Sequence, residues 1–319
     1  MYLAEITVVK PSNRQLYKAC DELCFLSKNL YNAILYIHSQ RYQEGESYIG
    51  YFDMIKLLIK QENVDYRAIA TYASGYVAKQ VHENFKSFFS VSKKKKDGKY
   101  DKKVRPPRYK DPVKGRNITT YYKEGLSKQT YRKEGLIHLL QTNIKFKSKI
   151  PLEQIQKVIV VPKLGFYELQ VIHKVEEAKP VVTENVAGID LGLNNLATVV
   201  TTNSSPFIIN GRPLKSINHH WNKKKAKLQS KLSKGVKTSK QIRNITNKRN
   251  RRDNNYLHNA SRALVNELIK QSISKVVIGY NNGWKENINL GKRNNQNFVQ
   301  IPFGRFIEMI IYKCTLAGI

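Results

Sequence analysis

The stretch that decides the fold is Val186-Ala187-Gly188-Ile189-Asp190-Leu191-Gly192-Leu193-Asn194-Asn195-Leu196-Ala197-Thr198-Val199-Val200. Two apolar runs flank one carboxylate set between glycines, a pattern typical of a strand, a tight turn and a returning strand. An Asp at the end of a buried strand is costly unless a partner compensates its charge. Two roles therefore stay open for Asp190: it caps the turn through its own backbone, or it binds a divalent cation.

The composition indicates a polyanionic partner. The chain has 319 residues, enough for two or three domains, and 56 Lys and Arg against 24 Asp and Glu give a net charge of +32. Such a charge opposes compaction unless many phosphates neutralise it, so nucleic acid is favoured over a membrane surface. No apolar segment approaches the roughly 18 residues of a membrane span, and no signal peptide opens the chain. We therefore expect a cytoplasmic, nucleoid-associated protein.

The cysteines do not indicate a metal centre. Only Cys20, Cys24 and Cys314 occur, and no Cys-x-x-Cys pair exists. We therefore expect buried free thiols in a reducing compartment and no zinc in this chain.

The first half of the chain predicts a small β-barrel or sandwich interrupted by helices. β-Branched residues predict a strand over 2–9. Apolar residues at helical spacing predict helices over 14–44, 51–61 and 71–90. In the third helix Val77, Val81, Phe85 and Phe88 face inward, which favours a core stripe over a base-stacking platform. Short strands are then predicted over 119–122, 136–139, 157–161 and 167–172.

Two segments are predicted to contact phosphates. The first is a basic loop punctuated by Gly and Pro, with Lys93, Lys94, Lys95, Lys96, Lys102, Lys103, Arg105, Arg108 and Lys110. The second, residues 212–252, contains fifteen Lys or Arg and no acid, and is predicted to form a long helical hairpin that turns near Gly235. Its candidate contacts are Lys223, Lys224, Lys225, Lys227, Arg243, Lys248, Arg249, Arg251 and Arg252, and a solvated face alone does not account for the missing counter-charge.

The end of the chain predicts a parallel strand and two helices. His258 to Gln271 is amphipathic, and residues 275–280 read as a short apolar strand of the buried parallel type. A loop rich in Gly and Asn precedes a helix from about Gly304 to Leu316. This loop carries two further candidate contacts, Lys292 and Arg293.

An ordered set of motifs resembles the TnpB/OrfB family of transposon-encoded proteins. Gly188-Ile189-Asp190-Leu191-Gly192 with Leu196-Ala197 resembles the family's first RuvC motif. Further similarities are Pro106 to Lys110, Arg251 with His258 to Arg262, Val276 to Gly279 with Gly283-Trp284-Lys285, Gly291 to Phe303, and Tyr312-Lys313. The resemblance runs over nearly the whole chain.

The resemblance implies an α/β fold plus a β-barrel. The expected parts are a β-barrel over 1–10 and 97–180, a helical recognition lobe over 11–96, and an RNase H-like (RuvC) domain over 184–319 that includes the basic hairpin 212–272. It also implies a guide RNA and a target DNA as partners, with base pairing reading most of the sequence. Cleavage in such a family uses two metal ions held by carboxylates, so Mg²⁺ is the expected cofactor of an active protein.

The chain departs from the family pattern at the expected catalytic centre. Asp190 fits the first metal ligand, but Gly279 stands where the family normally has a Glu. Glu286 and Glu308 are candidates for a relocated acid, although each also fits a surface position. The family's further strand, its zinc module and its third acid are not found before Ile319, so we expect an RNase H-like domain incomplete at its C-terminus.

Several functions are compatible with these departures. The chain is a truncated transposon product without activity, a nuclease-dead RNA-guided repressor, or a nuclease completed by a tract supplied elsewhere. A basic DNA-binding transposition accessory protein that uses no guide is the alternative outside the guided class.

Overall fold

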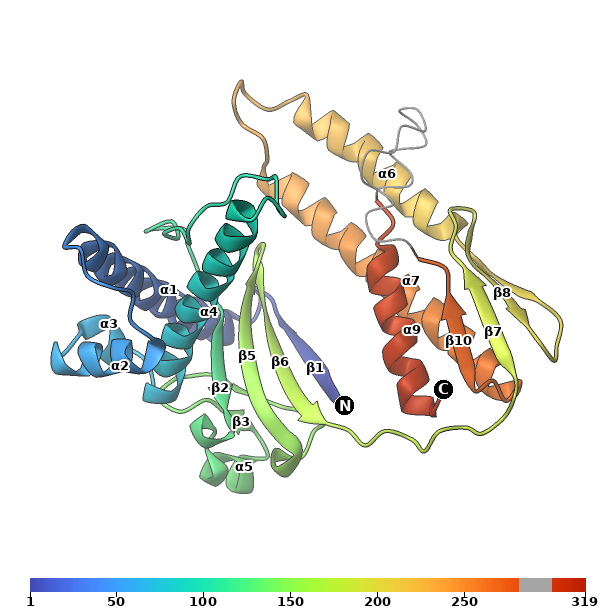
Figure 1. The fold of residues 1–319 in the computed structure, drawn as a ribbon, viewed down its shortest axis with the longest axis horizontal. Helices are drawn as coiled ribbons and strands as arrows, with labels where there is room; N and C mark the ends of the chain where they lie inside the picture. Colours follow the sequence, from blue (N-terminus) through green and yellow to red (C-terminus); the bar gives the residue numbers. More distant parts are fainter. Residues whose placement is uncertain (281–299) are drawn as a thin grey trace. The chain divides into compact units, whose positions relative to one another are not determined.

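The computed structural model describes residues 1–280 and 300–319. The chain divides into two compact units, Met1–Val175 and Glu176–Ile319, each with a hydrophobic core of its own (Figure 1). None of the helices in the described ranges is both long enough and apolar enough to cross a membrane.

The first unit is built on an antiparallel sheet with strand order β1-β6-β5-β2. Its strands are β1 (Tyr2–Val9), β2 (Thr119–Tyr122), β5 (Ile155–Lys163) and β6 (Phe166–Lys174), and a separate pair is formed by β3 (Ile137–His138) and β4 (Lys145–Phe146). Inward-facing residues alternate with outward-facing ones along β5 and β6, as expected for a sheet with one covered face.

The helices of the first unit supply the other half of its core. They are α1 (Arg14–Gln43), α2 (Tyr51–Lys60), α3 (Val64–Arg67), α4 (Thr71–Lys96) and α5 (Lys128–Glu134), with 3₁₀ turns at Lys123–Gly125 and Leu152–Gln154. The Asn13 side chain caps α1 by accepting from the Leu16 N–H at 3.4 Å. Buried residues of α1 and α4, such as Ile34 and Val77, share one core with Val158 and Leu169 of the sheet.

The prediction of a closed β-barrel is wrong. The four strands form an open sheet, with β1 and β2 at its edges, and α1 and α4 contact the strands (Figure 1). Closing a barrel needs enough strands to surround a filled interior. Here the apolar face of a four-stranded sheet is covered by helices instead.

The second unit is a mixed sheet with strand order β10-β7-β8-β9. Its strands are β7 (Val186–Asp190), β8 (Asn195–Thr201), β9 (Phe207–Asn210) and β10 (Lys275–Ile278). β7, β8 and β9 form an antiparallel meander, and β10 joins β7 in parallel. The helices α6 (Arg212–Gln229), α7 (Lys240–Lys270) and α9 (Phe303–Ala317) complete the described part of this unit.

Two predictions for this unit need correction. The basic segment and the amphipathic stretch from His258 are not separate helices, because α7 runs unbroken from Lys240 to Lys270. β10 is parallel, as predicted, but it is not buried on both faces, and Val277 is 53% exposed. β10 has β7 as its one described neighbour, so its other edge is unpaired among the described residues.

Candidate nuclease centre and nucleic-acid interface

Asp190 is the last residue of β7, the strand that pairs with both β8 and β10. Its neighbour Ile189 is buried in the core, so strand alternation directs Asp190 to the opposite face, where it is exposed. The same face carries Val200, Ile208 and Val277, which are 58%, 58% and 53% exposed. Asp190 is thus presented at the carboxyl end of a strand on a face that the described helices leave open.

The parallel strand β10 brings Gly279 next to Asp190. Ile278 pairs with Ile189, and the Gly279 N–H donates to the Ile189 carbonyl at 3.0 Å. The carboxyl ends of two adjacent parallel strands therefore meet here. A β-carbon at Gly279 would lie 3.7 Å from the Ile189 carbonyl oxygen, an ordinary contact distance, so the backbone leaves room for a side chain.

The turn after Asp190 is held against the start of α6. The Gly211 N–H donates to the Asn194 carbonyl at 2.7 Å, and the Lys215 ammonium donates to the Asn194 side chain at 2.7 Å. A β-carbon at Gly211 would lie 2.3 Å from the Leu193 carbonyl oxygen, so this close approach requires glycine. We did not single out Lys215 from the sequence. The available signal was Gly211-Arg212-Pro213 directly after a strand, which is typical of a helix start.

The described acids do not gather around Asp190. Glu308 is exposed on α9, a helix whose Phe306 and Ile310 share the core with Ile189, on the face of the sheet away from Asp190. Glu286, Lys292 and Arg293 lie outside the described residues. Within 1–280 and 300–319, no three His, Cys, Asp or Glu side chains come together to hold a metal ion. This part of the chain therefore does not form a two-metal centre by itself.

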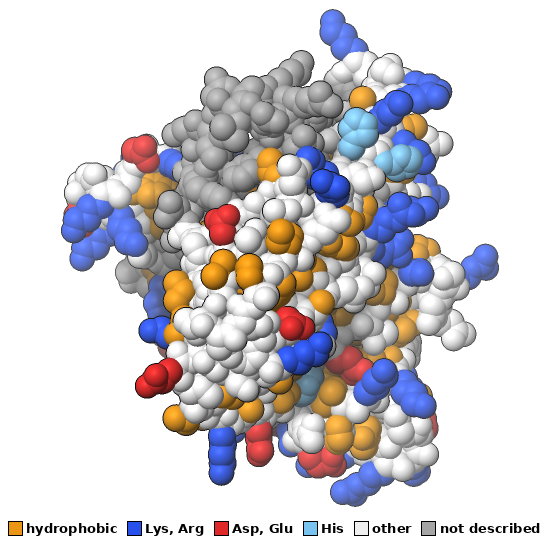
Figure 2. Space-filling model, turned by 90° about the vertical axis from the view of Figure 1, so that its right-hand side faces the viewer, with side chains coloured by type: hydrophobic (Ala, Val, Ile, Leu, Met, Phe, Trp, Pro, Cys, Tyr) orange, Lys and Arg blue, Asp and Glu red, His pale blue; other side chains and the backbone are white. Residues whose placement is uncertain are grey.

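A basic helical hairpin forms from α6 and α7. The loop between them contains Gly235 with a φ of 86°, close to the predicted turn. The exposed cations along the two helices are Lys223, Lys224, Lys227, Arg243, Lys248, Arg251 and Arg252. In Figure 2, Lys and Arg side chains gather along the right-hand edge of the view. The segment 212–252 contains no acid to neutralise them.

Trp221 joins the two helices of this hairpin. Its indole N–H donates to the Thr246 hydroxyl at 3.1 Å, and the Arg249 guanidinium lies 4.5 Å from its ring centre. Lys225 also lies over this ring, at 4.7 Å. Two of the predicted phosphate contacts, Lys225 and Arg249, are thus half-buried against an aromatic side chain.

Arg249 also compensates a buried acid. Its guanidinium lies 3.2 Å from Asp253, which is 4% exposed. Burial raises the pKa of the Asp253 carboxyl, while Arg249 acts in the opposite direction. Arg249 therefore has a structural partner inside the helix.

A small notch opens between α6 and α7 beside Trp221. Its volume is about 100 Å³, and Ile217 and Ile245 form part of its wall. Its polar lining comes from His220, Lys224, Lys248, Arg249 and Arg252. Four cations around a notch of this size form a favourable site for one phosphate group.

The predicted basic loop of the first unit is partly helical. Lys93 to Lys96 form the exposed last turn of α4, where lysines interact favourably with the helix dipole. Lys102, Lys103, Arg105 and Arg108 are exposed in the segment that follows. Lys110 is held instead: its backbone exchanges two 2.9 Å hydrogen bonds with Asn32, and its ammonium lies 4.7 Å from the Tyr31 ring centre.

The second unit is thus a mixed sheet with an acid at the end of β7 and helices over one face. Residues 167–285 match the family model OrfB_IS605, described as a probable transposase. Over these residues the chain is similar to the TnpB/OrfB transposase family.

One solved structure has a similar fold, and a second match is weaker. A Cas12f1–sgRNA–target DNA complex matches with a TM-score of 0.54 at 15% identity, over 96% of this chain and 71% of that one. A CRISPR-Cas12f ternary complex matches with a TM-score of 0.37 at 14% identity, over 97% of this chain and 70% of that one. No curated protein matches the chain.

Proposed function

We propose that this protein binds a guide RNA and uses it to bind matching DNA. The observation that carries this proposal is the α6–α7 hairpin, which presents exposed cations over a segment without an acid, within an RNase H-like unit. Electrostatic binding without sequence preference suits a protein whose sequence reading is delegated to base pairing. The similar fold of a Cas12f1 complex that contains an sgRNA and a target DNA supports the same partners.

We place phosphate contacts at two positions. The first is the notch of the hairpin, where Lys224, Lys248 and Arg252 converge on a volume of about 100 Å³. The second is the exposed basic segment of the first unit, with Lys102, Lys103, Arg105 and Arg108. Among residues 1–280 and 300–319, none of these side chains forms an ion pair with an acid, so they are available to phosphates.

We further propose that the protein binds target DNA without cutting it. Asp190 fits Mg²⁺ chemistry as a first carboxylate ligand, but the adjacent strand end offers Gly279, and the described residues supply no cluster of three ligands. Two-metal hydrolysis needs carboxylates on both sides of the metal pair. A DNA-bound protein of this kind would act by occupying its site.

The first experiment identifies the bound RNA. The full chain is purified after expression beside its native flanking DNA, and the RNA that remains bound is sequenced. We expect one enriched class of small RNA that consists of a constant region and a variable end. Recovery of only random cellular RNA would refute the guided function. The remaining alternative would then be a basic DNA-binding accessory protein.

The second experiment tests cleavage. The RNA-loaded protein is incubated with a matched DNA target and Mg²⁺, and retention of the DNA is measured alongside strand breaks. We expect retention without breaks. Breaks that disappear in Asp190→Ala would show that other acids complete the centre, and would refute the non-cutting function while the guided binding stands.

A further inference from the structure

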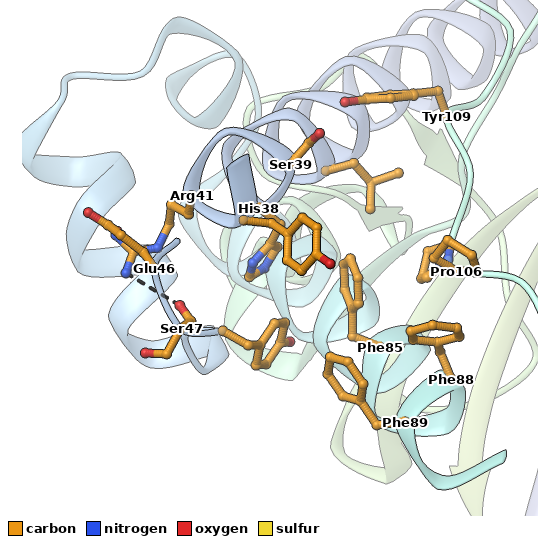
Figure 3. Close-up of a pocket in the computed structure, with 14 residues that line it drawn as sticks. His38, Ser39, Arg41, Glu46, Ser47, Phe85, Phe88, Phe89, Pro106 and Tyr109 are labelled. Atoms are coloured by element: carbon orange, nitrogen blue, oxygen red, sulfur yellow. Dashed lines mark hydrogen bonds and ion pairs between the residues drawn. The ribbon is translucent and has the colours of Figure 1, made fainter. Parts of the chain in front are cut away.

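The first unit contains a cavity of about 450 Å³ lined mainly by aromatic rings (Figure 3). The C-terminal half of α1, the segment after it, α4 and the proline segment 106–109 form its walls. His38, Phe85, Phe88 and Phe89 point toward this space. Of its fourteen lining residues, Leu35 is the one branched aliphatic side chain.

The rings of the cavity support one another. His38 and Tyr48 stack with centroids 4.6 Å apart and an interplanar angle of 10°. The Tyr48 hydroxyl is held 2.9 Å from Nδ1 of His82, and Phe85 packs against Phe89 at 5.9 Å. These contacts fix flat surfaces before any ligand arrives, which lowers the ordering cost of binding.

The cavity keeps rings accessible that a closed core would bury. Phe85 and Phe88 were predicted to face the core, yet both are only partly buried, and Phe89 is 44% exposed. Val81 and Val77, one and two turns earlier on α4, are fully buried. Phe85 still packs against the core, and from Phe85 to Phe89 the aromatic stripe of α4 also forms the wall of an open site.

Polar groups at the cavity suit a neutral planar ligand. Burial lowers the pKa of His38 to about 4, so its ring is uncharged at neutral pH. Arg41 is neutralised by an ion pair with Glu46, while its Nε–H is buried and has no partner among the described residues. The wall thus offers flat rings without net charge.

Cations lie beside the cavity. A neighbouring cavity of about 350 Å³ shares Phe88, Pro106 and Pro107 with it and is lined by Lys103 and Arg105. Both cations are exposed, as is Arg108 two residues beyond Pro106. A chain of phosphates can follow these cations while a group attached to it enters the ring-lined cavity.

We propose that this cavity is a binding site for one unpaired nucleobase of a single-stranded nucleic acid. Flat aromatic walls stack on the π-face of any base, and the adjacent cations neutralise its backbone. An apolar peptide would favour aliphatic walls and would not use the cations, so charge complementarity selects the nucleic acid. The inference deepens the proposed nucleic-acid function, but it does not require a guide RNA.

The experiment compares two synthetic single strands on the full chain. One is a twelve-nucleotide oligo(dA), and the other is an abasic strand of equal length and charge. The pocket variant combines Phe85→Leu with Phe89→Leu, which removes two rings and keeps apolar volume. The matched control combines Phe52→Leu with Tyr72→Leu, two aromatic residues that are 65% and 54% exposed and do not line the cavity.

We expect the pocket variant to bind oligo(dA) about tenfold more weakly than the wild type, because stacked bases lose affinity by at least this order when their ring is removed. Its affinity for the abasic strand should be unchanged, and the control variant should match the wild type on both strands. Equal binding of the two strands by the wild type, or equal losses on both strands in the pocket variant, overturns the proposal. So does an unaltered affinity of the pocket variant for oligo(dA).

Light scattering on the same proteins tests whether a second copy of the chain occupies the cavity instead of a nucleobase. If the wild type forms a dimer that the pocket variant cannot form, the cavity belongs to a second copy of the chain and the nucleobase site is refuted. A failure to recover a specific guide RNA leaves the oligonucleotide comparison intact, so the two proposals can fail separately.

Discussion

At the scale of single residues, Gly279 and Asp190 define what the candidate centre has and lacks. Asp190 ends β7 and Gly279 directly follows the adjacent parallel strand β10, and the Gly279 N–H donates to the carbonyl of Ile189. Asp190 therefore lies where the carboxyl ends of two parallel strands meet. The backbone beside it carries no side chain, although the open distance of 3.7 Å would accept one.

We predict that Gly279→Glu folds normally and gains affinity for Mg²⁺. A second carboxylate beside Asp190 should raise that affinity roughly tenfold or more, since affinity grows with the number of charged ligands. Calorimetric titration of Mg²⁺ measures the effect, and circular dichroism monitors the fold. Gly279→Gln is the matched neutral control, and adding Asp190→Asn should remove the gain. A Gln variant that binds Mg²⁺ equally well would contradict the prediction.

At the scale of elements, buried charges hold the helices of the second unit together. Between α7 and α9, the Lys313 ammonium donates to the Ser261 hydroxyl at 2.6 Å and to the His258 carbonyl at 2.7 Å. Lys313 is 3% exposed, and desolvation together with Arg262 lowers its pKa to about 8. Within α7, Arg249 compensates the buried Asp253.

The Lys313 contact predicts a pH dependence of stability. The folded pKa of about 8 lies below the unfolded value near 10.4, so between these values the unfolded chain binds more protons. Lys313 therefore makes stability rise as pH increases through this window. Urea unfolding of wild type and Lys313→Met should show a difference that shifts in favour of the wild type from pH 7.5 to pH 10. A difference independent of pH would rule this out.

The Arg249–Asp253 pair predicts a loss of stability when one partner is removed. Arg249→Ala should destabilise the protein by about 3 kcal/mol, because it leaves an uncompensated buried carboxylate. The Asp253 pKa, already raised by burial, should rise further, so the folded state binds the proton more tightly and the variant regains stability as pH falls from 7 to 5. Denaturant unfolding at both pH values measures this. Adding Asp253→Asn should restore part of the loss at pH 7, and an unimproved double variant would contradict the argument.

At the scale of the whole molecule, the cations fall into two groups. Some are held by partners inside the protein, and others are exposed and can contact phosphates. Lys110, Lys225, Arg249 and Lys313 are each held by a ring or a polar partner inside the protein. The exposed cations of the hairpin and of the segment after α4 have no such partner in the ion pairs of the described residues. A net charge of +32 alone does not separate these two groups.

The uneven distribution predicts how binding depends on salt. Removing one phosphate contact should reduce the slope of log affinity against log salt by about 1. Lys224→Ala and Lys248→Ala should each do so for double-stranded DNA, measured by fluorescence anisotropy between 50 and 200 mM salt. Lys270→Ala is the control, since Lys270 is paired with Glu267 at 3.2 Å at the far end of α7. An unchanged slope in both notch variants would exclude them from the phosphate contacts.

The sequence by itself determined the elements and their character. The spacing of apolar residues and the β-branched residues predicted the strands 2–9 and 119–122 and the long helix from Arg14. Such patterns reflect which face of an element can be buried. The sequence also shows that the segment 212–252 has no acid and that an acid stands at the end of the β7 strand. Both are properties of local sequence, so no distant contact was needed to find them.

Only the tertiary structure decided how those elements close and which side chains stay free. Four strands form an open sheet because helices, not further strands, cover their apolar face. Phe85 packs against the core and also lines a cavity, because the proline segment near 106–109, about twenty residues later, forms the opposite wall of that cavity. Arg249 turns inward because Trp221 of α6 packs against it across the hairpin. Each result depends on residues far apart in the chain, whose proximity no local pattern encodes.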